Sequence, residues 1–308
     1  MRRGSISGSA LGAAFLLLIW QPAHAEALRV CLDESIPLYS VHRGGTASGF
    51  DLAVAGAVAK RLGRTLEMQW FESKLDEESS SALAANALLS DCRCALVGGY
   101  ALVRDALGKP GTETARLPDH EGAKPADRRR AVPLGTLVPS RPYHFAALTV
   151  VLGPGAASKR IAGLGDLEGL RIGVESGTLS DAALMLFDGG RLIRWINHVV
   201  PGRGQLIPRL EAGEFDAILV ELRRFDAHRA ANPTTGLAPS GYYYPVGFNM
   251  GFVSLSTHQS LIEQVNQAID GLLKDGELPA LAQAIGLTYL PAREPAVREK
   301  LSLDDLRK

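Results

Sequence analysis

Apolar residues in the first hundred positions alternate between short strand-like runs and stretches with the period of a helix. The strand-like runs lie at 28–32, 65–71 and 95–99. Between the first two runs, a helix is predicted from the apolar face formed by Leu52, Val54, Val58 and Leu62. A second helix is predicted at 79–89. Strand, helix and strand in this order form βαβ units, whose strands pair in parallel. The polar and aromatic loop after the first strand predicts a small-molecule cleft at the carboxyl edge of that sheet.

The same alternation returns after residue 143. Strands are expected at 143–152, 170–174, 217–220 and 242–255, and helices at 181–187, 205–212, 223–231, 259–274 and 278–285. Two strand-rich crossings, at 143–152 and 245–255, bracket a self-contained α/β block. One lobe inserted into another through two strands is a hinge, and hinged lobes close around ligands.

We therefore predict an α/β fold with two parallel-sheet lobes joined by a two-strand hinge. Lobe 1 comprises residues 26–147 and 246–290, and lobe 2 comprises residues 148–245. The stretch 108–140 is rich in Pro, Gly and charge, so it is predicted to be a surface insertion of lobe 1, either ordered across the cleft or mobile. Residues 291–308 form a charged tail that reads as a surface helix or a frayed end.

The first 25 residues have the pattern of an export signal. A basic start, Arg2-Arg3, precedes an apolar run at 10–20 and the small-x-small site Ala23-His24-Ala25. The apolar run is too short for a comfortable membrane span. We expect cleavage near Ala25, a periplasmic location, and no lipid anchor, because no cysteine stands at the cleavage site.

Composition argues against several classes of function. Lys+Arg and Asp+Glu both number 33, so there is no excess of positive charge for binding nucleic acid. The seven histidines are scattered, without metal-ligand spacing or a nucleophile–base motif. We expect no enzyme activity, no catalytic residue, no metal, no cofactor and no nucleic-acid partner, and we expect a monomer.

Three cysteines fit an oxidising compartment. Cys31 lies in the first strand, and Cys92 and Cys94 come just before the strand at 95–99. If these are neighbouring parallel strands, Cys31 can bond to one of the pair, whereas Cys92 and Cys94 are too close in sequence to bond easily to each other. We favour a Cys31–Cys94 disulfide with Cys92 free.

Four segments, taken in order, carry a family resemblance. They are LRVCLDESIPLYS with GFDLAVAGAVAKRLG, then LEGLRIGVESGTLSDA, then LEAGEFDAILVE, and finally VSLSTHQSLIEQVNQAIDGLLKDGELPALAQAIGL. In this order and spacing the chain resembles extracellular solute-binding proteins of family 3, the periplasmic type II binding fold of amino-acid receptors. The resemblance implies a small polar or amino-acid-like ligand held between the lobes and a partner permease of an ABC importer.

The resemblance also implies that certain turns face the cleft. Ser176-Gly177-Thr178 precedes a helix, so its backbone N–H groups and hydroxyls would receive an anion; the alternative is an ordinary helix cap. Tyr39 occupies a position where the family stacks an aromatic ring on the ligand. The remaining candidates near the first and third strands are Asp33, Gly99 and Tyr100.

Two charged residues align with ligand-binding positions of the family, although the surrounding motif or the residue type differs. Amino-acid receptors hold the ligand carboxylate with an arginine in a Thr-Pro-Glu-Arg motif after the glycine turn, and Arg104 aligns with it across a one-residue gap, with Ala101 in place of the threonine. Glu221 stands where the family places an aspartate for the ligand amine, while Asp216 is expected to be structural.

Two other functions remain open. The pattern Arg29-Val30-Cys31-Leu32-Asp33, with Cys94 before the third strand, resembles accessory proteins of periplasmic quinoprotein methanol dehydrogenases, which would make the cleft a docking surface for that protein. The chain also resembles cyclohexadienyl dehydratases in fold. If it were such an enzyme, Glu221 would be the catalytic acid, provided that the cleft buries it.

Overall fold

The computed structural model describes residues 26–73, 81–127, 130–202 and 205–307, together with Met1. The predicted signal peptide therefore lies, apart from Met1, outside the described residues. Within the described ranges, no helix has the length and apolarity needed to cross a membrane.

Two sets of parallel strands form the two ends of one continuous sheet. Among the described residues the sheet has ten strands, in the order β13-β12-β14-β11-β15-β6-β1-β5-β8, with β10 beside β15. Lobe 1 is built on β5 (Thr65–Glu72), β1 (Ala27–Asp33) and β6 (Leu96–Ala101). Lobe 2 is built on β13 (Ile196–Val199), β12 (Ile172–Glu175) and β14 (Ala217–Glu221). In each lobe the first strand of the unit lies in the middle, flanked in parallel by the next two strands.

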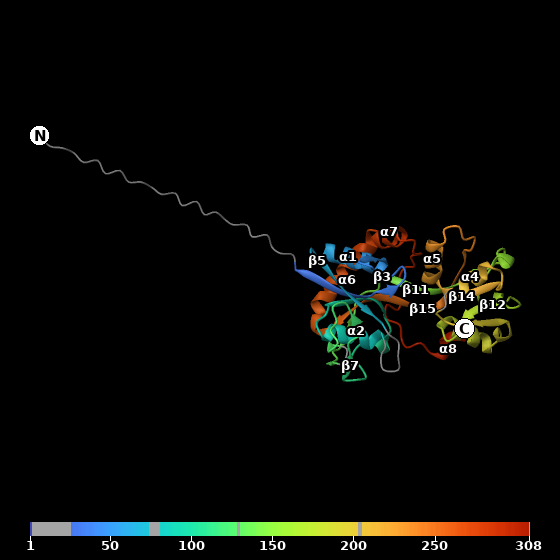
Figure 1. The fold of residues 1–308 in the computed structure, drawn as a ribbon, viewed down its shortest axis with the longest axis horizontal. Helices are drawn as coiled ribbons and strands as arrows, with labels where there is room; N and C mark the ends of the chain where they lie inside the picture. The colour runs from blue at the N-terminus through green and yellow to red at the C-terminus, as the bar shows by residue number, and fades with distance from the viewer. Residues whose placement is uncertain (2–25, 74–80, 128–129, 203–204, 308) are drawn as a thin grey trace.

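Two long strands connect the lobes. They are β11 (His144–Leu152) and β15 (Pro239–Leu255). They pair with each other antiparallel, while β11 also pairs with β14 and β15 also pairs with β6. Figure 1 shows them between the two lobes. The predicted two-lobed α/β fold with a two-strand hinge is confirmed, and the proposed lobe limits at 147 and 245 fall inside these strands.

Helices cover both faces of each lobe. In lobe 1, α1 (Phe50–Arg61), α6 (Gln259–Lys274) and α7 (Glu277–Ala284) share one apolar core, and α2 (Ser81–Ser90) packs in a second. In lobe 2, α3 (Leu179–Leu186) packs in one core, and α4 (Leu206–Glu211) and α5 (Leu222–Ala231) pack in the other. The sequence of α6 explains its placement, because Leu261, Val265, Ile269 and Leu272 recur on one buried face.

The shorter elements are hairpins and 3-10 turns. A small sheet consists of β2 (Ser35–Ile36), β3 (Ser40–Arg43) and β4 (Thr46–Ser48). The 3-10 turns include η1 (Arg104–Ala106), η3 (Pro154–Ala156), η4 (Leu164–Leu167), η5 (Phe187–Gly189), η6 (Ile193–Trp195) and η7 (Ser256–His258).

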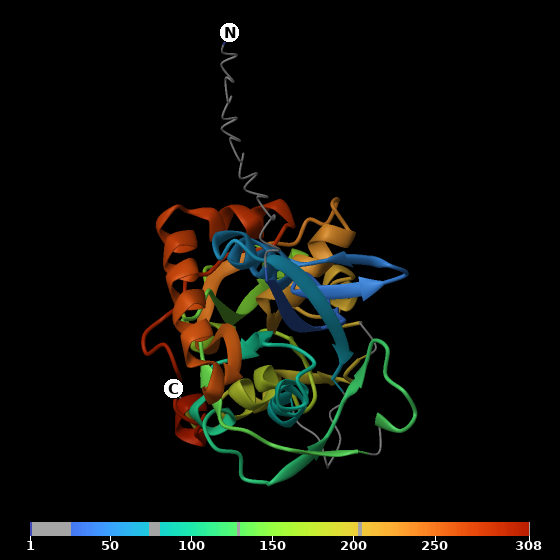
Figure 2. The ribbon, with the colours of Figure 1, turned by 90° about the vertical axis from the view of Figure 1, so that its left-hand side faces the viewer.

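The insertion at 108–140 lies on lobe 1, beside α2 and along the sheet. Its strands are β7 (Thr114–Arg116), β8 (Asp119–His120), β9 (Ala131–Pro133) and β10 (Leu137–Pro139). Strand β8 extends the sheet beyond β5, β10 pairs with β15, and β7 pairs with β9 (Figure 2). Leu117, Val132 and Leu137 are buried in the α2 core. The described part of the insertion is therefore anchored by burial and strand pairing.

The tail crosses from lobe 1 to lobe 2. On lobe 1, the backbone of Arg298 donates to Leu102 O and accepts from Arg104 N, both at 2.9 Å. On lobe 2, α8 (Leu303–Leu306) buries Leu306 in the α3 core, and the Tyr244 hydroxyl donates to Leu306 O at 3.4 Å. Figure 1 shows α8 in the half of the molecule that contains lobe 2, where it contacts α3. The tail thus forms a third connection between the lobes, rather than a frayed end.

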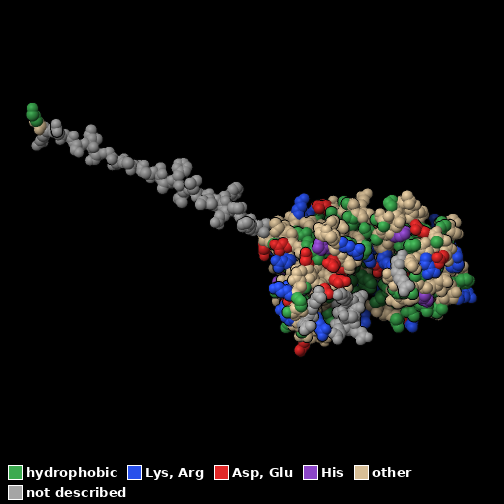
Figure 3. Space-filling view, in the orientation of Figure 1, with side chains coloured by type: hydrophobic (Ala, Val, Ile, Leu, Met, Phe, Trp, Pro, Cys, Tyr) green, Lys and Arg blue, Asp and Glu red, His purple; other side chains and the backbone are tan. Residues whose placement is uncertain are grey.

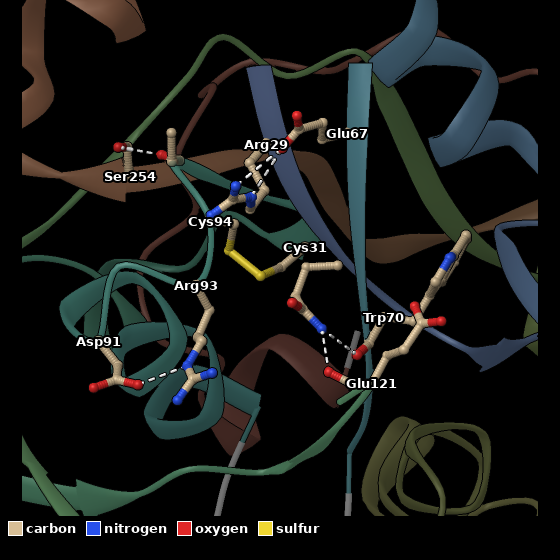
Figure 4. The surroundings of a disulfide bond; sticks show 11 residues. Arg29, Cys31, Glu67, Trp70, Asp91, Arg93, Cys94, Glu121 and Ser254 are labelled. Carbon is tan, nitrogen blue, oxygen red and sulfur yellow. Dashed lines mark hydrogen bonds and ion pairs between the residues drawn. A yellow bond between two sulfur atoms is a disulfide. The ribbon is translucent and has the colours of Figure 1, made fainter. Parts of the chain in front are cut away.

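A disulfide joins the first and third strands of lobe 1 (Figure 4). Cys31 in β1 bonds to Cys94, which lies two residues before β6. Both cysteines are buried, and β1 and β6 are parallel neighbours, which is the condition on which the predicted pairing depended. Cys92 is a free, exposed thiol. The predicted Cys31–Cys94 pairing is confirmed.

Candidate functional site

A cavity of about 230 Å³ lies at the junction of the two lobes, against the paired strands β11 and β15. Residues from turns of both lobes complete it. Most of the lining is apolar, and includes Ile36, Phe145, Ala146, Leu148, Leu179, Phe248 and Met250. Figure 3 shows the surface hollowed between the two halves, with hydrophobic side chains in the hollow. Such a concave, largely apolar site with a few polar groups is typical of small-molecule binding.

One corner of the cavity carries a pair of opposite charges. Glu221, at the end of β14, and Arg223, in the first turn of α5, form an ion pair at 2.6 Å. The Arg223 guanidinium also lies over the Tyr39 ring, 5.2 Å from its centre, and donates to Pro37 O at 3.3 Å. Because Tyr39 and Pro37 belong to lobe 1, Arg223 connects the two lobes at the cavity.

Tyr39 and His144 form a neutral polar pair on the cavity wall. The Tyr39 hydroxyl lies 2.6 Å from His144 Nε2. Burial lowers the pKa of His144 to about 4, and burial raises the pKa of Tyr39 far above its ordinary value. At neutral pH the imidazole is therefore uncharged, and a hydrogen bond joins it to the neutral tyrosine hydroxyl.

A buried carboxylic acid lies behind the cavity wall at Gly99. The Tyr143 hydroxyl donates to Asp51 Oδ1 and accepts from Gly99 N, both at 2.8 Å. Burial raises the pKa of Asp51 to about 7, against the opposing effects of the Tyr143 hydrogen bond and the Arg223 charge. Gly99 has φ +64°, and a Cβ there would stand 2.5 Å from Asp51 Oδ2. This position therefore requires glycine.

Three of the residues predicted for the site line the cavity: Tyr39, Gly99 and Glu221. Glu221 is not buried as a dehydratase acid would be, because its side chain is 52% exposed and ion-paired.

Three other predicted residues have structural contacts elsewhere. Asp33 accepts from the backbone N–H groups of Ser35 and Ser73, at 2.9 and 3.1 Å, and so fixes the turn after β1. The Tyr100 hydroxyl donates to Ala106 O at 2.6 Å, within the α2 core. Arg104 has a 65% exposed side chain and pairs with Glu299 at 2.5 Å.

The turn Ser176-Gly177-Thr178 uses its polar groups as a helix cap. Thr178 Oγ1 accepts from Asp181 N at 3.2 Å and donates to Glu175 O at 2.8 Å. Gly177 N donates to Asp181 Oδ2 at 2.8 Å, and Ser176 N donates to Val199 O at 3.0 Å. The next residue, Leu179, is the one that lines the cavity.

A second ion pair lies behind this turn. Arg224 donates to both carboxylate oxygens of Glu175, at 2.5 and 2.7 Å. The Glu175 side chain is only 4% exposed. Thr178 lines a small recess beside this pair, adjoining Glu221. The pair ties β12 to α5, and so fixes the helix that carries Arg223.

Sequence reasoning missed Arg223, His144, Asp51 and Tyr143. Arg223 follows the predicted site residue Glu221 by two positions, and this proximity is the sequence feature that comes nearest to identifying it. Asp51 is an acid at the start of an apolar helix, which is the sequence signal that could have identified it. Across the described residues, no group of three His, Cys, Asp or Glu side chains could hold a metal.

The chain has two α/β lobes joined by crossing strands, which is the fold of two-lobed solute-binding proteins, as the following solved structures show. The L-cystine solute receptor of Neisseria gonorrhoeae, in its unliganded open conformation, is similar over 87% of this chain and 96% of its own, at 18% identity and a TM-score of 0.60. The second substrate-binding domain of a putative amino acid ABC transporter from Streptococcus pneumoniae is similar over 85% of this chain and 100% of its own, at 18% identity and a TM-score of 0.60.

A third similar structure is substrate-binding domain 2 of GlnP from Lactococcus lactis, in its open conformation. It matches 87% of this chain and 97% of its own, at 16% identity and a TM-score of 0.60. No family model and no curated protein matches the chain. These likenesses show the fold. The narrower resemblance to quinoprotein accessory proteins finds no support among them and stays a prediction.

Proposed function

We propose that this chain is a periplasmic solute-binding protein, which captures a small amino-acid-like ligand between its lobes and passes it to the permease of an ABC importer. The observation that carries the proposal is the cavity at the lobe junction, which both lobes line. A ligand there would contact both lobes at once, and so would favour the closed arrangement over an open one.

The chemistry of the lining suits a ligand with an apolar body and few charges. The walls are mainly aliphatic and aromatic side chains, the Tyr39–His144 pair is uncharged, and Glu221 and Arg223 together carry no net charge. The ligand-binding residues that we propose are Tyr39, Gly99, His144, Glu221 and Arg223. We propose no catalytic step for this site.

A thermal-shift screen tests the proposal. A ligand that binds only the folded protein stabilises it by about 2.7 kcal/mol at a hundred times its dissociation constant, so the melting temperature should rise. The screen uses the standard amino acids and small organic acids, with titration calorimetry on each hit. Absence of any shift across both sets would count against the proposal, and so would hits that survive Ala146→Trp, which places a large side chain at a partly exposed position of the cavity wall.

One observation favours the alternative that this chain is an accessory protein of a quinoprotein dehydrogenase. The cysteine pattern on which that resemblance rests includes Cys31 and Cys94, which form a disulfide in the structure. Pull-down of a periplasmic quinoprotein dehydrogenase by the purified protein, lost in Ala146→Trp, would favour a docking role for the cleft. Solute binding without such capture would favour transport.

A further inference from the structure

The cavity has one cationic side chain among the described residues that line it, and that side chain is Arg223. Arg104, the arginine aligned with the family's carboxylate clamp, lies outside the cavity and is paired with Glu299. If a ligand with a carboxylate occupies this cavity, as the proposed function requires for an amino-acid-like solute, its counter-charge has to come from a residue other than Arg104.

Arg223 is held in place by contacts from both lobes. Its side chain is 17% exposed, with the guanidinium over the Tyr39 ring and Nη1 donating to Pro37 O. A guanidinium has five N–H donors, so these contacts leave donors for a carboxylate. Arg223 also lies in the first turn of α5, where no side chain caps the helix. The free N–H groups of that turn add partial positive charge at the same place.

The partner of Arg223 is replaceable. Glu221 is half exposed, and an ion pair with such exposure is worth at most about 1 kcal/mol. The neighbouring Glu175–Arg224 pair shows the opposite case, because Glu175 is buried and bound through both oxygens. A ligand carboxylate could therefore displace Glu221 from Arg223, while Arg224 stays committed to Glu175.

We propose that Arg223 is the carboxylate-binding residue of this cavity, and that the ligands are compact carboxylates with an apolar body. In this arrangement the carboxylate is held by lobe 2, at the start of α5, and not by the lobe 1 turn that carries Arg104. Glu221 is the resting counter-ion of Arg223. Once displaced, it turns to the ligand's ammonium group, or to water where the ligand has none.

Two sets of matched compounds test the proposal. L-Leucine is compared with 4-methylpentanoate, which lacks the amine, and with 3-methylbutylamine, which lacks the carboxylate. Phenylalanine, 3-phenylpropanoate and 2-phenylethylamine form the second set, with a larger apolar body. Calorimetry gives the dissociation constant of each compound for the wild type, Arg223→Gln, Arg223→Lys, Glu221→Gln and the control Arg29→Gln, which breaks the exposed Arg29–Glu67 pair on β1 and β5.

Arg223→Gln should weaken binding of the four compounds that carry a carboxylate by about tenfold or more, the loss expected for a hydrogen bond to a charged group. Arg223→Lys should recover part of that loss, since it keeps the charge without the planar fork. Glu221→Gln should tighten binding of the two amine-free carboxylates by about two- to fivefold, because it removes the carboxylate that competes for Arg223. Arg29→Gln should change nothing.

Other outcomes overturn the proposal. If the amine-only compounds bind best, or if Arg223→Gln leaves carboxylate binding intact, the carboxylate is bound elsewhere, while solute binding itself stands. If none of the six compounds binds but the wider screen gives a solute, the ligand class is wrong and the proposed function stands. If nothing binds in either experiment, both fail. Unchanged circular dichroism of each variant confirms that a loss is not caused by unfolding.

Discussion

The carboxyl ends of the parallel strands carry polar residues in both lobes, but these residues have different roles. In lobe 1, Asp33 fixes its own turn, and Gly99 binds Tyr143, which in turn binds Asp51. In lobe 2, β14 ends at Glu221, which faces the cavity with Arg223. Lobe 1 therefore offers an apolar and uncharged wall, whereas lobe 2 offers the charges.

The difference also extends to how each lobe is held together. Lobe 1 has a disulfide between its central strands, and lobe 2 has the buried Glu175–Arg224 pair between β12 and α5. A binding wall made of neutral groups needs a rigid backbone to keep its shape. A wall that carries charges needs the helix that bears them to be held in place, and the Glu175–Arg224 pair holds α5. The comparison predicts that each lobe loses stability through a different kind of substitution.

The largest effect is expected from loss of the disulfide. The bond closes a loop with a sequence separation of 63, and removal of such a constraint costs about 4 kcal/mol. Cys31→Ala with Cys94→Ala should therefore lower the stability of lobe 1, and Cys92→Ser is the matched control. Trp70 lies in lobe 1 and Trp195 in lobe 2.

Urea unfolding of the chain expressed from Glu26 checks this prediction. The fluorescence of Trp70 is followed in a Trp195→Phe background, and the fluorescence of Trp195 is followed in a Trp70→Phe background. In the variant without the disulfide, the urea concentration at the unfolding midpoint should fall more when Trp70 is the reporter than when Trp195 is. Equal shifts would show that the lobes unfold as one unit.

The next effect is expected in lobe 2. Arg224→Gln leaves the Glu175 carboxylate buried without its partner, which costs about 3 kcal/mol. The midpoint from Trp195 should now fall more than the one from Trp70. The double variant Glu175→Gln with Arg224→Gln should recover part of the loss, because it removes the unpaired charge. Failure of the double variant to recover would assign the cost to lost packing of the arginine.

Asp51 gives a smaller effect, which depends on pH. Its pKa is raised from 3.8 to about 7 in the folded protein, so between these values the folded state holds a proton that the unfolded state has lost. Stability is therefore highest below the unfolded pKa and falls as pH rises toward 7, by about 2 kcal/mol from pH 5 to pH 7. Asp51→Asn should flatten this slope in urea titrations at several pH values.

The control for Asp51 is an aspartate with the opposite shift. The side-chain hydrogen bond from Arg171 lowers the pKa of Asp216, so its contribution to stability is lost only as the solution becomes more acidic than this window. Asp216→Asn should leave the slope between pH 5 and pH 7 unchanged. A slope equally steep in wild type and Asp51→Asn would show that another group carries the pH dependence.

The smallest effect is expected at Arg104. Its pair with Glu299 is exposed on both sides, so Arg104→Gln should cost less than about 1 kcal/mol. It should also leave the dissociation constant of any ligand unchanged, as measured by calorimetry. A tenfold loss of binding would return the carboxylate site to lobe 1 and break the contrast between the lobes.

The fold could be predicted well from the sequence because it depends on local patterns. Apolar runs and helix periods indicate the βαβ units, and the Cys31–Cys94 pairing follows once the two strands are parallel neighbours. The insertion and the tail were harder to place. Val132 comes shortly after three consecutive arginines and Leu306 stands between Asp305 and Arg307, and the burial of both depends on surfaces formed by distant segments.

The site was predicted only in part, because its polar groups are chosen by long-range contacts. Arg223 meets Pro37 across 186 residues, and Tyr143 meets Asp51 across 92. No local period records such contacts. Conversely, Tyr100 and Asp33 lie at cleft-like positions in sequence, yet their side chains bond to nearby backbone. Strand ends can be located from sequence, but the direction of each side chain requires the packed neighbours.

The third crossing makes the molecule suited to optical measurement of lobe closure. β1 begins at Ala27 on lobe 1, whereas α8 ends at Leu306 in lobe 2. A donor dye at Glu26 and an acceptor dye at Arg307 would therefore sit on opposite lobes. Energy transfer between the dyes would report the distance between the lobes. A solute that closes the lobes would then be detected by the change in this distance, and the chain would not have to be circularly permuted.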